Sequence, residues 1–356
     1  GGFTLNAAED VCRPSNDMDY DVLDDIASLE EKSLLKREAS QSDSRFAMLD
    51  TVREYAEERL ADSGEAEEVK RKHAEYFCAY AADVGPTVGG LNRMASLNRL
   101  ERDHNNFRLA LAWSFESGAE ELGIDLTIAL DSYWEAGHPI EALNWYDRAI
   151  RAGNTPSSAQ AHALCMAGHN RCNLGDMKRG MSQIEQGLNM ARGLAHAKGI
   201  AASLKLLGQW YFDSGSEKAA MYLEECIEVA KESDLTWAIP GALLQLGELA
   251  AGDGDLERAQ SLFEEALVYW EEDSNVVGAA FARMNMGMIA ALQGKFEPAI
   301  AILEQSLTII RQPGNKYSIA ITLLRLASIY LKQGNLARSK VLLAEAMPFF
   351  CEIAIK

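Results

Sequence analysis

The stretch "LLQLGELAAGDGDLERAQSLFEEAL", residues 243–267, contains one copy of a pattern that recurs along this chain. Two glycines, Gly247 and Gly254, stand seven positions apart, and the small residues Ala259 and Ala266 follow them. Periodicity of this kind decides the architecture of a chain, so it is tested first. This stretch therefore leads to the fold prediction.

Five segments align with the same spacing. The first small position is occupied by Gly168, Gly208, Gly247, Gly287 and Ala327. The second glycine is Gly175, Gly215, Gly254, Gly294 and Gly334. Each column repeats every 39 or 40 residues. The first small residue allows two helices to approach closely, and the second glycine suits a left-handed helix end. Each unit is therefore predicted to be helix, turn, helix.

The second predicted helix of each unit has its own pattern of small, large and small positions. Its first small position is Gly180, Ala219, Ala259, Ala299 and Ser339. The large apolar position is Ile184, Leu223, Phe263, Leu303 and Leu343, and the next small position is Gly187, Cys226, Ala266, Ser306 and Ala346. One helix pair cannot bury both of its faces, so neighbouring pairs are expected to stack. An earlier copy spans residues 129–153, with Gly137, Ala142, Tyr146 and Ala149 in the matching places.

The pattern resembles the tetratricopeptide repeat, although its period exceeds that family's 34 residues. HEAT or armadillo repeats have a closer period but a different pattern, and they remain the alternative. The predicted fold class is mainly α: a tetratricopeptide-like α-solenoid, wound as a right-handed superhelix. A small winged-helix remnant with a two-stranded wing is predicted to precede it.

Composition excludes several classes of function. The chain has 356 residues and a net charge of −19, which repels nucleic-acid phosphates, so we expect no direct nucleic-acid contact by this segment. No apolar run is long enough to span a membrane, and the six cysteines form no framework, which favours reduced thiols and a cytoplasmic location. The abrupt, apolar ends suggest a piece of a longer protein. An uncapped last repeat around Leu342, Leu343, Phe349 and Phe350 predicts self-association.

The N-terminal region is predicted to be a winged helix. Residues 21–31 have helical apolar spacing, and residues 32–49 are typical of two short strands around a Ser/Asp turn. The stretch at 45–60 then changes from strand alternation to an amphipathic helix. The helix before the wing carries Asp21, Asp24, Asp25, Glu30 and Glu31, so we interpret this region as a packing module rather than a reader of bases.

Several motifs together resemble the bacterial STAND-type ATPase regulators, including MalT-like and LuxR-type large activators. The matching segments are "LDDIASLEEKSLL" at 23–35, "RF" with Met48, Leu49 and "TVREYA" at 45–56, "RKHAEYF" at 71–77 and "LNRLERDHNNFRLALAW" at 97–113. The resemblance implies a winged helix and connecting helices that follow a nucleotide-binding domain and precede a tetratricopeptide-like sensor. It also implies a DNA-binding domain at one terminus of the intact protein.

This chain departs from the complete family pattern because it lacks a P-loop. No GxxxxGK[ST] motif occurs, and "GPTVGG" at 85–90 has no lysine. We therefore assign no nucleotide hydrolysis, no cofactor and no enzymatic activity to this segment. An upstream nucleotide-binding domain of the same protein is the expected partner.

One helix carries His162, Cys165, His169 and Cys172 on a single stripe. Pairs of these side chains suit zinc or copper. The stripe extends over about 15 Å at 1.5 Å per residue, too far for four ligands to share one ion. Packing or a position facing the groove is the alternative, and no metal site is assigned.

The same register predicts which side chains face the groove of the superhelix. The candidate ligand-binding residues are His162, His169, Asn173, Lys205, Gln209, Phe212, Asp213, Glu248, Met284 and Met288. Such a mixture of polar and soft apolar groups suits a peptide or a small amphipathic ligand. The alternative is that these polar groups are simply solvated and that the methionines fill gaps in the core.

We therefore predict three regions: a winged-helix remnant with a coupling helix at 1–64, a connecting helical pair at 65–118, and the repeats at 119–356. The predicted function is the signal-sensing arm of a multidomain, ATP-dependent transcription regulator, with a protein, peptide or small-molecule inducer in the groove. The alternative is a tetratricopeptide scaffold that has neither an ATPase nor a small-molecule ligand. A quorum-peptide receptor is a third hypothesis.

Overall fold

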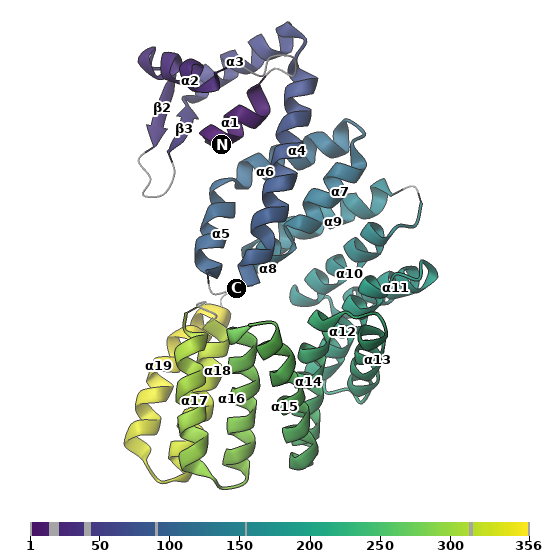
Figure 1. The fold of residues 1–356 in the computed structure, drawn as a ribbon, viewed down its shortest axis with the longest axis vertical. Helices are drawn as coiled ribbons and strands as arrows, with labels where there is room; N and C mark the ends of the chain where they lie inside the picture. Colours follow the sequence, from purple (N-terminus) through teal and green to yellow (C-terminus); the bar gives the residue numbers. More distant parts are fainter. Residues whose placement is uncertain are drawn as a thin grey trace. The chain divides into compact units, whose positions relative to one another are not determined.

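A computed structural model describes residues 2–13, 21–38, 44–89, 92–153, 155–312 and 316–354 (Figure 1). The predicted turn of the wing lies largely outside these residues. Contacts divide the chain into two compact units, residues 1–88 with 95–155 and residues 89–94 with 156–356. The boundaries predicted at 64/65 and 118/119 remain predictions.

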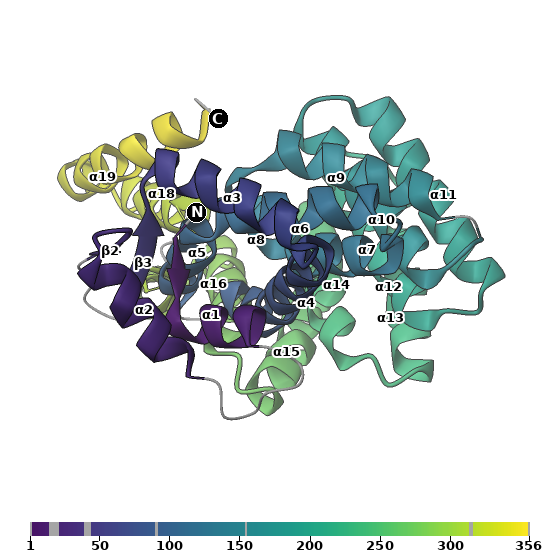
Figure 2. The same cartoon turned by 90° about the horizontal axis from the view of Figure 1, so that it is seen from above.

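The N-terminal module pairs two helices with a three-stranded antiparallel sheet. Its elements are β1 (Phe3–Thr4), α1 (Leu5–Cys12), α2 (Val22–Glu31), β2 (Leu35–Glu38) and β3 (Arg45–Met48). The strand order is β1-β3-β2, so the predicted two-stranded wing gains a third strand. Phe3 lies opposite Phe46, and a strand of two residues is too short to show alternation in the sequence. Figure 2 shows the sheet beside α1 and α2, whose apolar side chains form its small core.

The predicted change from strand to helix at residues 45–60 is confirmed. Strand β3 ends at Met48 and α3 (Asp50–Ser63) begins two residues later. The predicted connecting pair contains more elements than expected. These are α4 (Ala66–Val84), the 3-10 turn η1 (Gly85–Gly89), α5 (Arg93–Arg102) and α6 (His104–Glu116).

The first predicted repeat consists of α7 (Glu120–Ala129), α8 (Asp131–Gly137) and α9 (Pro139–Ala152). Pro139 occupies the first turn of α9, where its missing N–H costs little. Ala142, Tyr146 and Ala149 are fully buried, as their places in the pattern predict.

The second unit is a series of antiparallel helix pairs (Figure 1). The pairs are α10 (Ser158–Asn173) with α11 (Met177–Gly193), α12 (Ala197–Asp213) with α13 (Lys218–Glu232), α14 (Ile239–Gly252) with α15 (Leu256–Glu272), α16 (Val276–Leu292) with α17 (Phe296–Ile310), and α18 (Lys316–Lys332) with α19 (Leu336–Ala354). A 3-10 turn, η2 (Thr236–Ala238), precedes α14.

The small residues act as predicted. A Cβ added to Gly208 would lie 2.5 Å from a methyl carbon of Leu223, and one added to Gly247 would lie 2.4 Å from the Phe263 ring. The turn glycines adopt the left-handed conformation, with φ of 90° at Gly175 and 87° at Gly254. Their backbones close each first helix, because Gly175 N–H donates to Cys172 O and Asp176 N–H donates to Arg171 O.

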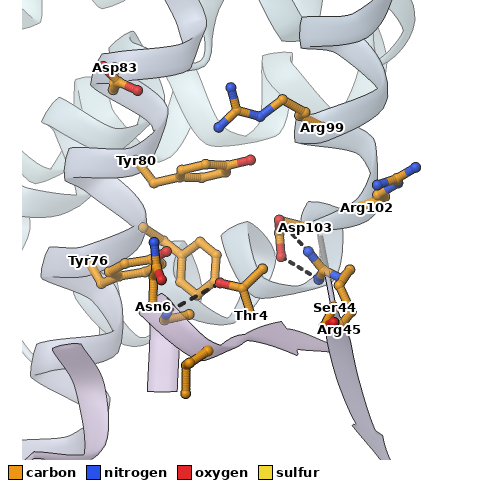
Figure 3. A pocket seen from close by; sticks show the side chains of 13 residues that line it. Thr4, Asn6, Ser44, Arg45, Tyr76, Tyr80, Asp83, Arg99, Arg102 and Asp103 are labelled. Atoms are coloured by element: carbon orange, nitrogen blue, oxygen red, sulfur yellow. Dashed lines mark hydrogen bonds and ion pairs between the residues drawn. The ribbon is translucent and has the colours of Figure 1, made fainter. Parts of the chain in front are cut away.

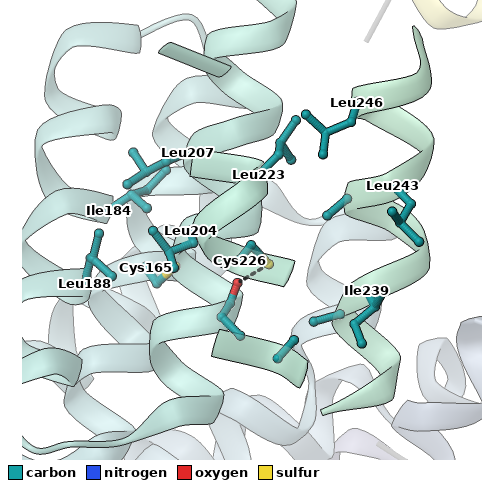
Figure 4. Packing of buried hydrophobic residues seen from close by; sticks show 14 of the residues in the cluster. Cys165, Ile184, Leu188, Leu204, Leu207, Leu223, Cys226, Ile239, Leu243 and Leu246 are labelled. Atoms are coloured by element: carbon teal, nitrogen blue, oxygen red, sulfur yellow. Dashed lines mark hydrogen bonds between the residues drawn. The ribbon is translucent and has the colours of Figure 1, made fainter. Parts of the chain in front are cut away.

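Leucines and isoleucines fill the space between pairs. Leu204 and Leu207 of α12 pack with Ile184 of α11 and Leu223 of α13 (Figure 4). Each fully buried leucine stabilises the fold by about 1.5–3 kcal/mol relative to an exposed one. Leu343 differs from the residues that precede it in its column, because 39% of it is exposed and no further pair covers α19 in the described part of the chain.

The first helix of each pair lies against the first helix of the next pair, in the order α10, α12, α14, α16 and α18. The second helices of successive pairs contact one another less. The series therefore curves toward the first helices. We call the face carried by α10, α12, α14, α16 and α18 the inner face.

Candidate functional site

Three polar side chains from three successive pairs meet on the inner face. Glu248 belongs to α14, Asn285 to α16 and Arg325 to α18, which are the first helices of three consecutive pairs. The guanidinium of Arg325 donates to Asn285 Oδ1 at 2.7 Å, and a second nitrogen lies 3.8 Å from Glu248 Oε1. The side chains of Glu248 and Arg325 are only 28% and 20% exposed. We call these three residues, with the neighbouring Gln245, the polar cluster.

Burial shifts the pKa values of the two charged side chains in this cluster. It raises the pKa of Glu248, against the opposing effects of Arg325 and Asn285. Asp213 of α12 raises it further by repulsion between carboxylates. Burial also lowers the pKa of Arg325, against the effect of Glu248. The ion pair is therefore poorly solvated, and each charge depends on the other.

The two amides of the cluster are buried behind the charged pair. A hydrogen bond from Asn285 lowers the pKa of Glu248, so the Asn285 amide serves both charged side chains: its oxygen accepts from Arg325, and its nitrogen faces Glu248. Gln245 Oε1 is buried and has no hydrogen-bond partner among the described residues. The partly exposed groups that a ligand can reach are therefore the carboxylate of Glu248 and the guanidinium of Arg325.

Other predicted groove residues have partners near the start of the series. Trp210 Nε1–H donates to His169 Nδ1 at 3.2 Å, and His169 is buried. The ammonium of Lys205 lies 5.5 Å from the centre of the Trp237 ring. Asp213 is exposed at the end of α12, and partial burial raises its pKa.

The remaining predicted groove residues do not join this arrangement. Met284 is buried in the core, where Thr322 Oγ1 lies 3.0 Å from its sulfur, so it packs rather than presenting a surface. Asn173 is exposed at the end of α10. His162, Gln209, Phe212 and Met288 are half-buried on their helices.

The His/Cys stripe of α10 is mainly a packing surface. Cys172 is buried, and a Cβ on Gly180 would lie 2.4 Å from its sulfur. Burial raises the pKa of Cys172 to about 11, which disfavours the thiolate that binds metals. In the described part of the chain, three potential ligands converge elsewhere, at Glu101, His104 and His138.

Gln245, Asn285 and Arg325 were missed by the sequence prediction, although a signal was present. All three occupy one register position, two residues before Gly247, Gly287 and Ala327. When one register position is polar in three successive repeats, its side chains are expected on the same exposed or functional face of the array.

A second polar site lies in the first unit, between the sheet and the connecting helices. Arg45 of β3 donates two hydrogen bonds to Asp103, at 2.7 and 3.0 Å, and both side chains are less than 10% exposed (Figure 3). Asn106 donates to the same carboxylate at 2.8 Å. The hydrogen bond from Arg45 to Asp103 raises the pKa of Arg45. Beside the pair lies a cavity of about 420 Å³, lined in part by Tyr80 and Arg99.

Residues 239–312 match the family model described as "Tetratricopeptide repeat". The chain is a tetratricopeptide-type helical repeat protein. This match confirms the fold class predicted from the glycine columns, and the close contacts at Gly208 and Gly247 show how the pattern produces the fold.

Among sequenced relatives, a Mycobacterium tuberculosis protein named as an HTH-type transcriptional regulator is 30% identical over 273 residues. The match covers 73% of this chain, and the chain spans 30% of the length of that relative. The repeat protein is thus related to transcriptional regulators, whereas the narrower resemblance to MalT-like and LuxR-type activators stays a prediction.

Two solved structures share the fold at low identity. One is a signal transduction ATPase with numerous domains (STAND) protein with a tetratricopeptide repeat sensor from Pyrococcus horikoshii, with a TM-score of 0.52 and 15% identity, covering 100% of this chain and 62% of that one. The other is NprR in complex with its cognate peptide NprX, with a TM-score of 0.52 and 16% identity, covering 63% and 66%. Within the residues described, no helix is both long and apolar enough to cross a bilayer.

Proposed function

We propose that this chain is the signal-sensing, non-catalytic arm of a multidomain, ATP-dependent transcription regulator, and that its inner face binds a peptide or an extended protein segment. The polar cluster carries the proposal, because it joins three successive repeats and its two charged side chains, Glu248 and Arg325, are partly exposed on one face. The relationship to HTH-type regulators supports the regulatory context. NprR, whose structure contains its cognate peptide NprX, supports this class of ligand.

Apolar side chains near the cluster support the same ligand class. Leu324, one residue before Arg325 on α18, is 41% exposed, and Tyr317 is 60% exposed. A peptide can place apolar side chains against these residues while its polar groups pair with Glu248 and Arg325. A small polar inducer would use the cluster alone.

The proposed signal then passes to the N-terminal module. In the intact regulator, a ligand that prefers one arrangement of the arm shifts how the module packs on an upstream ATPase. The buried Arg45–Asp103 pair would transmit such a shift, because it fixes β3 to α6.

A heptapeptide display library, selected on the purified chain, tests the binding site. Peptides recovered on the wild type should bind Asn285→Ala and Arg325→Met variants at least tenfold more weakly, as expected when a charged or buried polar contact is lost. Arg258→Met is the matched control, because its exposed pair with Glu224 at 3.3 Å lies on the second helices. Equal binding to all variants, or an absence of selected peptides, would contradict the proposed peptide site.

The regulatory role needs a test in the intact protein. Deletion of residues 119–356 should change ATP hydrolysis and DNA affinity if the repeats sense a signal. Unchanged values for both would favour the scaffold alternative instead.

A further inference from the structure

Three side chains with metal-binding chemistry converge in the first unit. Glu101 lies in the last turn of α5, His104 in the first turn of α6, and His138 between α8 and α9. One potential ligand atom from each lies within 4.8 Å of the others. Helix ends that are far apart in the sequence therefore bring two imidazoles and a carboxylate together.

Hydrogen bonds connect the three ligands. His138 Nε2 and the Tyr133 hydroxyl lie 2.9 and 2.8 Å from the same Glu101 oxygen. The Tyr133 hydroxyl also lies 2.7 Å from His104 Nδ1. The two imidazole rings are stacked, with centres 4.5 Å apart.

Each nitrogen of His104 has its own polar neighbour. Nδ1 lies 2.7 Å from the Tyr133 hydroxyl, which also contacts Glu101. Nε2 lies on the other side of the ring, 3.1 Å from Glu141 Oε2.

This arrangement suits a bound cation. His104 Nδ1 could coordinate the cation through a lone pair while Nε2–H donates to Glu141.

Glu141 is itself well placed for this supporting role. Arg108 Nε donates to it at 2.7 Å and Trp145 Nε1 at 3.2 Å, so its carboxylate is fixed. A carboxylate that accepts from the outer nitrogen of a ligand histidine orients the ring and increases its basicity toward a metal. Glu141 therefore supplies the outer carboxylate that metal-binding histidines commonly use.

We propose that Glu101, His104 and His138 form a site for a divalent transition-metal ion, with Zn²⁺ as the best-matched ion. Two histidines and one glutamate are a known zinc ligand set, in which water completes the coordination. The ion joins the α5–α6 corner to the α8–α9 junction. The site clamps the connecting helices to the first repeat, independently of ligand binding on the inner face.

The test uses the untagged, EDTA-treated chain titrated with ZnCl₂ by calorimetry, with native mass spectrometry for stoichiometry. We expect one tightly bound ion, and at least a tenfold loss of affinity in His138→Gln and in Glu101→Gln. The Glu101 side chain is 59% exposed, so Glu101→Gln preserves the fold even if His138→Gln does not. His196→Gln is the control, because it removes a histidine from the second unit.

A Co²⁺ titration supplies a second readout, since its visible absorption reports nitrogen and oxygen coordination. A tetrahedral Co²⁺ spectrum that disappears in Glu101→Gln but persists in His196→Gln supports the site. Failure of the wild type to bind Zn²⁺, or Zn²⁺ affinity in the Glu101 and His138 variants equal to that of the wild type, would overturn it.

Discussion

The guanidinium of Arg45 on β3 and the carboxylate of Asp103 before α6 form a buried, doubly hydrogen-bonded ion pair. Arg45 also donates to Gly2 O at 2.7 Å, which ties the start of the chain to the same point. The residues are 58 positions apart, so the pair joins the N-terminal sheet to the connecting helices. This contact holds the two parts of the proposed signalling junction together.

Breaking this pair should destabilise the first unit strongly. Arg45→Met leaves the Asp103 charge buried without its partner, which costs about 3–5 kcal/mol. Hydrogen exchange of peptides from residues 44–113 in increasing urea measures the change. Arg53→Met is the control, since its exposed pair with Asp50 at 3.0 Å should contribute less than about 1 kcal/mol. A similar small effect in both variants would show that the buried pair contributes little.

Two glycines of α14 should respond oppositely to alanine. Gly247→Ala drives a methyl group to within 2.4 Å of the Phe263 ring and should destabilise the pair by about 1–3 kcal/mol. Gly241→Ala meets nothing within 4 Å and should be neutral or stabilising by up to about 1 kcal/mol. Urea unfolding of the two variants compares them directly, and equal effects would refute the close-packing role of Gly247.

The inner face should become less stable as pH rises. The folded state raises the pKa of Glu248 above its ordinary value of 4.5, so this state binds more protons than the unfolded state just above that pH. Stability from this group is therefore lost as pH rises through the raised pKa. In Glu248→Gln this part of the pH dependence should disappear, as measured by urea unfolding from pH 4.5 upward. Glu265→Gln, from an exposed pair with Lys231, should keep the wild-type slope.

The first unit should show the opposite dependence through His73. Burial lowers the pKa of His73 from 6.5 to about 4, so the unfolded state binds the extra proton between these values. Stability is full above pH 6.5 and falls as pH decreases toward 4, by on the order of 3 kcal/mol at 1.36 kcal/mol per pKa unit. His73→Gln should flatten the acid side of the profile, measured by hydrogen exchange of peptides around residues 66–84. A profile identical to the wild type would assign the acid sensitivity to other groups.

The repeat region was predictable because one packing solution recurs. Each small residue must meet the next helix closely, so Gly208 and Gly247 specify helix contacts from spacing alone. The sequence could not reveal β1 in the same way, since two residues carry no period. Leu343 follows its column in sequence, yet it is 39% exposed, and the adjacent Leu342 is buried instead.

The sites were less predictable than the fold. Glu248 was expected on the inner face, but its pairing with Arg325 was not. The two residues are 77 positions apart in the sequence, and only the stacking of three repeats brings them together. Glu101 and His138 lie outside the regular columns, where no period relates the two positions. Their approach depends on the angles at which α5, α6, α8 and α9 end, and local sequence does not specify those angles.

The repeated contact between a small residue and the next helix also constrains how this gene can change in length. Because each interface from Gly168 to Ala327 uses equivalent positions, recombination that inserts or deletes one whole unit rejoins matching surfaces. A deletion of half a unit would instead leave an unpaired helix with an exposed apolar side. The array can therefore lengthen or shorten in steps of about 40 residues. The length of the inner face available to a ligand can change in this way without a new kind of helix contact.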